Sequence, residues 1–145
     1  MISGILATLA CGIFAGAAVY VSLVEHPARL SCGVKLALME WKPSYKRGTV
    51  MQASLAVIGS FLAGLSWWLD KNAAWLIGGI ILFAIVPFTL IVIFPTNKKL
   101  ENDKLDSPSP QTEHNLRLWG QLHAVRSVLS FLAFVIFLIA LRYQP

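Results

Sequence analysis

The chain has 145 residues, of which 57% are hydrophobic and 13% are charged, with a mean hydropathy of +0.68 and a net charge of +5. Because soluble domains carry roughly 25% charged residues, and because a short chain cannot bury this much apolar surface in water, the composition excludes a soluble domain and predicts one integral membrane domain over residues 1–145. The basic residues flank apolar runs and form no stripe on a soluble fold, so we expect the lipid bilayer and no nucleic acid as a partner.

The first apolar run covers residues 2–24, about the length that crosses a ~30 Å hydrocarbon core. No basic segment precedes it and no small-residue cleavage site follows it, so we expect a retained helix and not a signal peptide. Glu25-His26-Pro27 comes next. Because proline lacks an N–H and restricts the residue before it, the helix is predicted to end or bend there. The basic segment 28–46 then has room for a short interfacial helix near residues 30–41.

Three further apolar runs predict spans at residues 48–69, 74–94 and 119–141. Only Asp70-Lys71-Asn72 separates the second span from the third, so we expect these two helices to lie antiparallel. Pro87 is expected to kink the third span, and the polar segment 98–111, with Ser107-Pro108-Ser109-Pro110, is expected to contain a loop. The predicted fold is an all-α membrane protein, an antiparallel four-transmembrane-helix bundle.

Basic residues are distributed unevenly between the two sides of this bundle. Lys71 and Arg142 are the two assigned to one side, and nine others fall in the first and third connecting segments. Because lysine and arginine near spanning helices favour the cytoplasmic side, we expect a multi-pass protein with both termini non-cytoplasmic. The nine are Arg29, Lys35, Lys42, Lys46, Arg47, Lys98, Lys99, Lys104 and Arg117.

A histidine and an arginine lie inside the fourth apolar run. Charged groups in hydrocarbon cost roughly 2.5–3.5 kcal/mol each on insertion scales and are rare there unless they are used. Trp119, His123, Arg126 and Ser130 follow a spacing of four, three and four, so they share one face of a helix. This face predicts a functional site, although a bridging hydrogen bond within the bundle is the structural alternative for His123.

Polar side chains at the ends of the other three spans fall at the same depth as this face. Since buried polar groups need partners, we expect a polar pocket between the helices, open to the cytoplasmic interface. The residues assigned to this pocket are Glu25, His26, Tyr45, Thr49, Gln52, Thr96, Asn97, Trp119, His123 and Arg126. His114 and Glu40 are instead expected to be at the surface.

Several of these residues also have a purely structural interpretation. His26 could hydrogen-bond to loop backbone, Glu25 could be a solvated carboxylate, and Arg126 could reach lipid phosphates. Trp119 could be an interfacial anchor and Asn97 a helix C-cap. Glu25 and Arg126 are also expected to form a compensating ion pair that sets helix register.

Two histidines and a carboxylate raise the question of a metal site. The sequence has no H-x-x-E-H or E-x-x-H spacing there, and adjacent Glu25 and His26 point about 100° apart on a helix. Haem between His26 and His123 is disfavoured because both lie at similar depth near one edge. We expect no metal site and no cofactor, with a metal or haem left as the alternative. A disulfide between Cys11, inside a span, and Cys32, in a loop, is not expected.

The chain resembles the anthrone oxygenase-like family, a largely uncharacterised set of small four-helix membrane proteins. The resemblance covers nearly the whole chain and is carried by Glu25-His26-Pro27 after the first helix, Asn97 after the third, and Trp119-x-x-x-His123-x-x-Arg126 opening the fourth. It implies that molecular oxygen converts an anthrone, a tricyclic polyketide, to an anthraquinone without an added cofactor.

Such a reaction needs a base that removes a proton from the substrate and groups that stabilise the resulting oxyanion. His123 or His26 could be the base, and Arg126 or Asn97 could stabilise the oxyanion. Trp119 and Tyr45 could stack on a flat substrate. The candidate catalytic residues are His123, His26, Arg126, Asn97 and Glu25, and the candidate substrate-binding residues are Trp119, Tyr45, Gln52, Thr49 and Trp41.

The partners expected from this interpretation are the bilayer, molecular oxygen and a small hydrophobic molecule, either anthrone-like or quinone-like. The alternative from a different class is a non-catalytic bundle that binds a small hydrophobe or a metal, or that serves as an assembly partner. Gly12-x-x-x-Gly16 in the first run also permits close helix approach, so a homo-oligomer is a further alternative.

Overall fold

The computed structural model describes residues 2–105 and 108–143, and these residues are almost entirely helical. The elements are α1 (Ile2–Tyr20), η1 (Val21–Glu25), α2 (His26–Ser31), α3 (Val34–Asp70), α4 (Ala73–Phe88), η2 (Thr89–Ile93), α5 (Phe94–Asn102) and α6 (Pro110–Arg142). Because η1 and η2 are π-helical stretches inside longer helices, the described residues form four continuous helical rods: Ile2–Ser31, Val34–Asp70, Ala73–Asn102 and Pro110–Arg142. All four are long and apolar enough to cross a membrane, which confirms the predicted all-α membrane fold.

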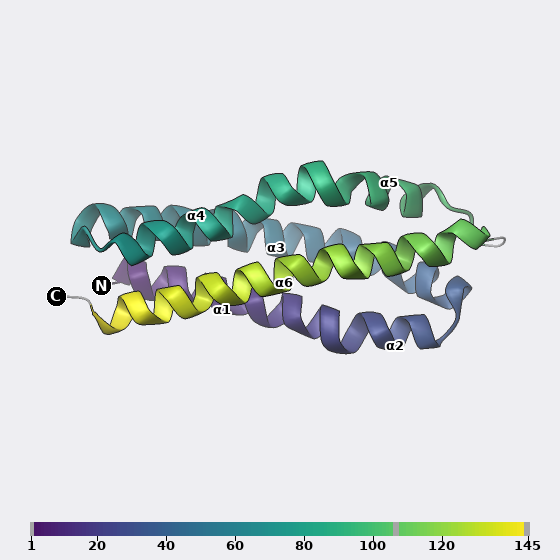
Figure 1. Cartoon of the computed structure of the whole chain (residues 1–145), viewed down its shortest axis with the longest axis horizontal. Helices are drawn as coiled ribbons and strands as arrows, with labels where there is room; N and C mark the ends of the chain where they lie inside the picture. Colours follow the sequence, from purple (N-terminus) through teal and green to yellow (C-terminus); the bar gives the residue numbers. More distant parts are fainter. Residues whose placement is uncertain (1, 106–107, 144–145) are drawn as a thin grey trace.

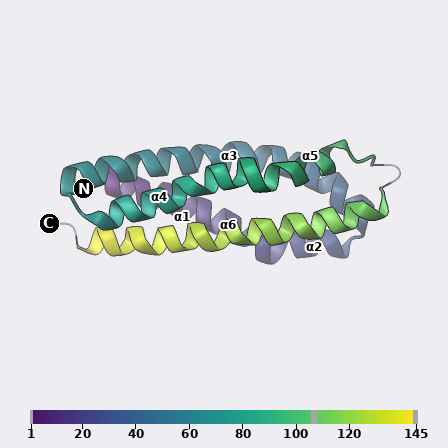
Figure 2. The ribbon, with the colours of Figure 1, turned by 45° about the horizontal axis from the view of Figure 1, so that its top comes forward.

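The four rods lie side by side and alternate in direction (Figures 1 and 2). Each packs against two neighbours, so that α1, α3, α4 and α6 follow one another around the bundle. Both chain ends lie at the same end of the bundle, and α2 and α5 lie at the other (Figure 1). The architecture is therefore an up-and-down antiparallel bundle.

The turn between α3 and α4 shows why those two helices return side by side. Lys71 adopts a left-handed conformation with φ 54°, and its N–H bonds to the carbonyl of Trp67, which ends α3. Asn72 then caps the next helix, because its side chain accepts a hydrogen bond from the N–H of Ala74 at 3.0 Å. Lys71 thus ends α3, and Asn72 caps the start of α4.

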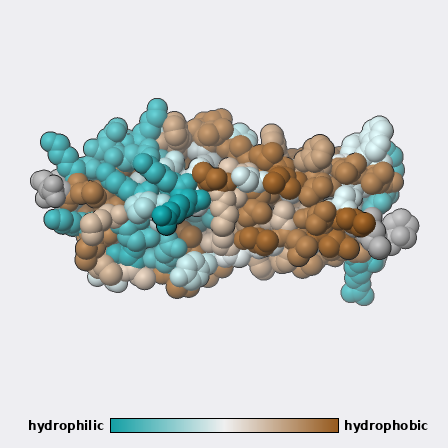
Figure 3. All heavy atoms as spheres, turned by 180° about the vertical axis from the view of Figure 1, so that it is seen from behind, coloured by the Kyte–Doolittle hydropathy of each residue, from teal (hydrophilic) through white to brown (hydrophobic). Residues whose placement is uncertain are grey.

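The rods are longer than a bilayer requires. About 20 helical residues cross a ~30 Å core, so counting from the end with the termini puts the far boundary at about residues 22, 50, 93 and 122. Rods of 30 to 37 residues therefore continue well beyond that boundary. Figure 3 shows the same division, with hydrophobic atoms over the half that carries the termini and hydrophilic atoms gathered over the other half. The predicted spans lie within these helices, and the side that faces the cytoplasm stays a prediction.

Two prolines that follow the π-helical stretches explain why the helices continue. Pro27 lies two residues after η1, and Pro95 lies two residues after η2. In each case the preceding residue bonds one position further back than in an α-helix, His26 N–H to Val21 O and Phe94 N–H to Thr89 O. A proline ring crowds the carbonyl four residues before it, and a widened π turn gives it room. The chain can therefore stay helical through both prolines.

Of the end or bend predicted at Pro27 the end is wrong, and two possibilities raised by the sequence are also not found. The first helix does not end at Pro27 but continues to Ser31. No separate interfacial helix covers residues 30–41, because α3 begins at Val34, after Gly33 with φ 88°, and runs unbroken to Asp70. Asn97 is not a helix C-cap, since α5 continues to Asn102. Of the predicted loop at 107–110, Ser107 lies outside the described residues and Pro110 already begins α6.

The apolar core is divided into two clusters with a polar layer between them. One cluster fills the half that carries the termini and includes Phe14, Trp75 and Phe137. The other fills the half with α2 and α5 and includes Trp41 and Trp119. Cys11 is buried in the first cluster and Cys32 is exposed, and both are free thiols, as expected. The polar layer is where the candidate site lies.

Candidate active site

A small cavity of about 40 Å³, here called the central chamber, lies in this polar layer. Helical spacing builds two of its walls, because residues four and three apart share a face. One wall comes from α3 and the other from α6, and η1 closes the side. Its lining residues are Val21, Ser44, Tyr45, Gly48, Thr49, Gln52, Trp119, His123 and Arg126. The structure thus brings together six candidates from the sequence: Tyr45, Thr49, Gln52, Trp119, His123 and Arg126.

Arg126 crosses the chamber to the opposite helix. Its Nη2 donates a hydrogen bond to Gln52 Oε1 at 2.6 Å, and its guanidinium lies 5.6 Å from the centre of the Phe14 ring. Its Nε is buried and has no hydrogen-bond partner within the described ranges. The expected ion pair between Glu25 and Arg126 is wrong, because Gln52 holds the arginine and Glu25 is bound elsewhere.

His123 is held by a short chain of hydroxyl groups. Its Nδ1 lies 3.1 Å from Ser22 Oγ, and Ser22 Oγ lies 2.8 Å from Ser127 Oγ. Ser127 Oγ also lies 2.8 Å from the carbonyl oxygen of Ala18, and since a carbonyl only accepts, Ser127 must donate there. Ser22 must then donate to Ser127 and accept from His123.

This hydrogen-bond chain assigns the tautomer of the neutral imidazole. Nδ1 of His123 carries the proton and Nε2 carries the lone pair. His123 is 3% exposed, and Nε2 has no hydrogen-bond partner among the residues that the structure describes. A basic nitrogen is therefore free on a residue that lines the chamber.

His26 is engaged at both of its ring nitrogens. Nε2 donates to the carbonyl oxygen of Leu116 at 2.9 Å, so Nδ1 is the acceptor that faces Arg29 Nη1 at 3.5 Å. Its ring also lies 5.0 Å from that of Trp119. His26 does not line the central chamber, and these contacts tie α2 to α6.

Gly120 is the residue that permits this approach of α6 to His26. A Cβ there would lie 2.5 Å from Cδ2 and 2.6 Å from Nε2 of an imidazole that cannot move without breaking its bond to Leu116. Gly120→Ala is expected to lower the free energy of unfolding by about 1–3 kcal/mol, as overpacking does. Gly48→Ala is the control, because a Cβ at Gly48 meets nothing within 4 Å. Thermal unfolding in detergent should show the loss in the first variant alone; equal midpoints would contradict this packing argument.

Asn97 and Trp41 pack behind Tyr45, which lines the chamber. Asn97 Nδ2 donates to the Tyr45 hydroxyl at 3.2 Å, and the Trp41 ring stacks on that of Tyr45 with centroids 4.8 Å apart. Trp41 is fully buried and also meets Trp119 edge-on at 5.8 Å. Asn97 and Trp41 thus support Tyr45 and Trp119 from behind and do not line the chamber in this structure.

Arg29 is the main residue that the sequence analysis missed. It was placed in a loop, but α2 makes it helical, and its buried guanidinium forms ion pairs with both Glu25 and Glu40. Its Nη2 also lies 3.3 Å from Ser44 Oγ. The available signal was the spacing of Glu25 and Arg29, four residues apart, which on a continuous helix makes an ion pair. Ser22 and Ser127 were missed as well, since isolated serines in apolar runs carry no pattern.

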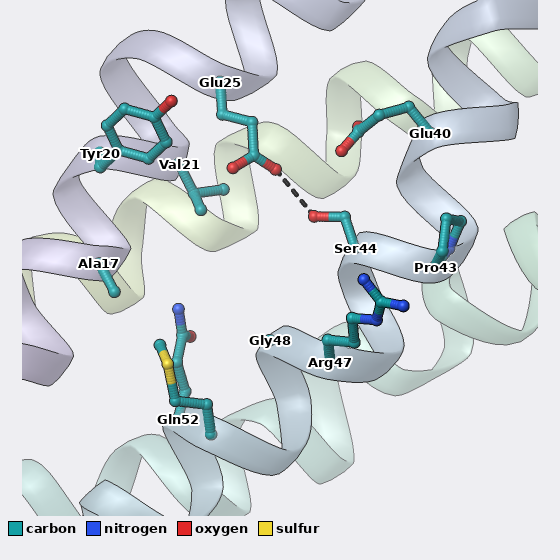
Figure 4. A pocket seen from close by; sticks show the side chains of 11 residues that line it. Ala17, Tyr20, Val21, Glu25, Glu40, Pro43, Ser44, Arg47, Gly48 and Gln52 are labelled. Atoms are coloured by element: carbon teal, nitrogen blue, oxygen red, sulfur yellow. Dashed lines mark hydrogen bonds between the residues drawn. The ribbon is translucent and has the colours of Figure 1, made fainter.

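A larger pocket of about 520 Å³, here called the outer groove, lies between α1 and η1 on one side and α3 on the other (Figure 4). Its lining residues are Ala17, Tyr20, Val21, Glu25, Glu40, Pro43, Ser44, Arg47, Gly48, Met51 and Gln52. Ser44 Oγ donates to Glu25 Oε1 at 2.8 Å across it (Figure 4). Four lining residues also line the central chamber: Val21, Ser44, Gly48 and Gln52.

A known protein family covers much of this chain. The family model described as anthrone oxygenase matches residues 41–136, which is more than half of the chain. The chain belongs to the anthrone oxygenase family. No curated protein and no solved structure matches it. The matched range contains the chamber residues of α3 and α6, whereas Ser22, His26 and Arg29 precede it.

In this anthrone oxygenase family protein, possible metal ligands are scattered. Among residues 2–105 and 108–143, no three His, Cys, Asp or Glu side chains are grouped closely enough to hold a metal ion. His26 and His123 both contact Trp119, at 5.0 and 4.9 Å between ring centroids. Nε2 of His26 is bound to backbone, so His123 alone of the two retains an unpartnered ring nitrogen within the described ranges.

Proposed function

We propose that this protein is a membrane-embedded oxygenase that oxidises a flat hydrophobic substrate of the anthrone or quinone class at the central chamber. One observation carries the proposal: the unprotonated Nε2 of His123 and the guanidinium of Arg126 belong to side chains that line the same cavity. A base that removes a proton from a carbon conjugated with a carbonyl, and a cation that stabilises the resulting oxyanion, are what this chemistry requires. The four helices are long and apolar enough to cross a membrane, which suits a substrate that dissolves in lipid.

In the proposed reaction, His123 removes a proton from the methylene carbon of the substrate. The electron pair delocalises onto the substrate oxygen, and Arg126 stabilises that oxyanion through an N–H group without a partner. The anion transfers one electron to O₂, and the two radicals combine in a carbon–oxygen bond. Protonation gives a hydroperoxide, R₂CH–OOH, which loses water to leave the ketone. The sum is R₂CH₂ + O₂ → R₂C=O + H₂O, so the substrate supplies all the electrons that oxygen needs.

Ser22 supports this cycle as a positioning residue. While His123 carries the proton, its Nδ1–H remains directed at Ser22 Oγ, which Ser127 and the carbonyl of Ala18 orient in turn. Proton uptake at Nε2 therefore needs no rotation of the imidazole. A site that is already oriented loses little energy to reorganisation during the reaction.

The direct test is turnover of anthrone by the purified protein in detergent micelles under ¹⁸O₂. We expect anthraquinone to form faster than in protein-free micelles and to carry one ¹⁸O atom in the new carbonyl. Oxidation no faster than in protein-free micelles would overturn the proposal. Retained binding of anthrone with no product would instead favour the alternative of a non-catalytic bundle that holds a small hydrophobe.

Replacing Ser22 by alanine removes the acceptor of the His123 Nδ1–H. We expect kcat to fall about tenfold, the equivalent of a lost hydrogen bond of ~1.4 kcal/mol, with KM nearly unchanged because Ser22 lines neither the central chamber nor the outer groove. Ser31→Ala is the matched control, since that hydroxyl is exposed and bonds only to the carbonyl of Ala28. A change in KM with constant kcat would show that Ser22 does not act through His123.

A further inference from the structure

The central chamber is too small for the substrate class proposed above. Its volume is about 40 Å³, whereas sites for drug-sized ligands measure ~300–1,000 Å³ and one water occupies ~30 Å³ of liquid. The chamber therefore has room for O₂ or for the reacting edge of a molecule, but not for three fused rings. The bulk of a tricyclic substrate must lie elsewhere.

The outer groove has the required size and connects to the chamber. Its volume of about 520 Å³ falls in the range of ligand sites. Val21, Ser44, Gly48 and Gln52 line both spaces, so a ligand in the groove lies directly beside the chamber. Gly48 has no neighbour within 4 Å of where a Cβ would stand. Its missing side chain leaves space at the junction.

The groove also crosses the expected boundary of the hydrocarbon. Ala17, Tyr20 and Met51 line its apolar end, at about the depth that twenty helical residues reach from the termini. Glu25 and Glu40 line its polar end, in the part of the bundle beyond that depth. A molecule that partitions to the membrane interface, with one apolar and one polar edge, matches this division.

The two carboxylates at the polar end retain hydrogen-bonding capacity. Figure 4 shows them directed into the pocket from opposite sides. Glu25 uses Oε1 for Arg29 and Ser44, and Glu40 uses Oε2 for Arg29. In the part of the chain that the structure describes, the second oxygen of each has no hydrogen-bond partner. Ionised carboxylates only accept, so a matching ligand supplies hydroxyl donors.

We propose that the outer groove binds the substrate as it arrives from the bilayer interface, and that this substrate is a flat aromatic with hydroxyl groups along one edge. Its hydroxyl edge faces Glu25 and Glu40, and its reacting edge passes Gly48 into the chamber. The choice of a flat aromatic rests on the proposed function. The binding site itself can be tested without turnover.

The test compares two glycines of α3. Gly48→Phe places a ring at the junction of groove and chamber, and Gly64→Phe places the same ring in a separate apolar pocket between α3 and α4, where a Cβ also meets nothing within 4 Å. The probe is 2,7-dihydroxyanthraquinone, a flat tricycle with both hydroxyl groups along one edge that cannot be oxygenated further in this reaction, and binding is followed by quenching of tryptophan fluorescence in micelles. We expect Kd to rise at least about tenfold in Gly48→Phe and less than about twofold in Gly64→Phe, with unchanged helicity in both.

The outcomes separate this inference from the proposed function. Equal Kd values for the parent protein and Gly48→Phe, or no binding by the parent, would overturn the groove as the substrate site. Binding that Gly48→Phe abolishes, in a protein that forms no anthraquinone from anthrone, would support the groove while removing the oxygenase proposal. If both phenylalanine variants form anthraquinone at the parental rate, the result would support the oxygenase proposal and overturn the groove as the substrate site.

A second comparison tests the hydroxyl preference. The parent should bind 2,7-dihydroxyanthraquinone more tightly than anthraquinone, because only the former donates to the carboxylates. Glu40→Ala should reduce that ratio toward one, because the variant lacks one of the two carboxylates that accept hydrogen bonds from the hydroxyl groups. An unchanged ratio would overturn the assignment of hydroxyl donors.

Discussion

Replacing His123 by alanine is expected to lower turnover of anthrone by about 10²- to 10⁴-fold, the range that a positioned general base contributes. The loss should appear in kcat, because Nε2 acts on the substrate only in the transition state. The measurement is the initial rate of anthraquinone formation, corrected for oxidation in protein-free micelles. Exchange of the methylene protons of anthrone into D₂O under argon should fall in parallel, since it isolates the proton-removal step from the reaction with oxygen.

His114→Ala is the matched control for this experiment. His114 lies on the same helix, nine residues earlier, and is exposed, as the sequence predicted. It should keep the parental rate and the parental proton exchange. Full turnover in His123→Ala would remove this histidine as the base. Lost turnover together with a lowered unfolding temperature would point instead to a structural role in the hydroxyl chain with Ser22 and Ser127.

Arg29→Met is expected to produce the largest loss of stability among the single substitutions considered. The guanidinium is 3% exposed and lies between Glu25, 25% exposed, and Glu40, 47% exposed. Breaking a buried ion pair costs roughly 3–5 kcal/mol when one charge is left unpaired, and because water can rehydrate both carboxylates in part, we expect about 2–3 kcal/mol here. The free energy of unfolding, measured by denaturant titration in micelles, provides the check.

Arg117→Met is the control for Arg29→Met, because both arginines pair with a glutamate four residues earlier but Arg117 is exposed where Arg29 is buried. Arg117 pairs with Glu113 four residues earlier on α6, but the two side chains are 63% and 49% exposed. Such surface pairs contribute about 0–1 kcal/mol, and pairs of this spacing on helices ~0.3–0.5 kcal/mol. If both substitutions cost the same, then Arg29 does not hold η1, α2 and α3 together in the way its contacts indicate.

These predictions share a structural basis in the π-helical stretch η1. It supplies Ser22 to the hydrogen-bond chain that holds His123, Glu25 to the ion pair with Arg29, and Val21 to the junction between chamber and groove. π-Helical stretches occur often at functional sites, where they change which way side chains point. Because η1 precedes Pro27 and makes room for its ring, this stretch keeps the helix continuous. The same stretch also positions side chains of the site.

The sequence alone determined the lipid-soluble character and the number of spans. Four apolar runs of membrane length, with a short turn at Lys71 and Asn72, predict four helices and an antiparallel pair in the middle. The sequence also predicted part of the chamber lining, because Tyr45, Gln52, His123 and Arg126 lie at similar depth when counted from the same end. Depth and periodicity follow from chain position alone, and so they can be derived without coordinates.

Only the tertiary structure decided which of these polar groups bind one another. Arg126 pairs with Gln52 and not with Glu25. The rotation of each helix about its own axis, together with side-chain packing, determines which of the polar groups at one depth come into contact. The helices continue past Pro27 and Pro95 because packing along the bundle favours a widened turn over an end, which a local proline rule does not include. The same continuity buries Arg29, gives His123 its hydroxyl partner, and opens the groove beside Gly48. The sequence therefore placed a polar site at one level of the bundle, and tertiary packing determined its hydrogen bonds and its two cavities.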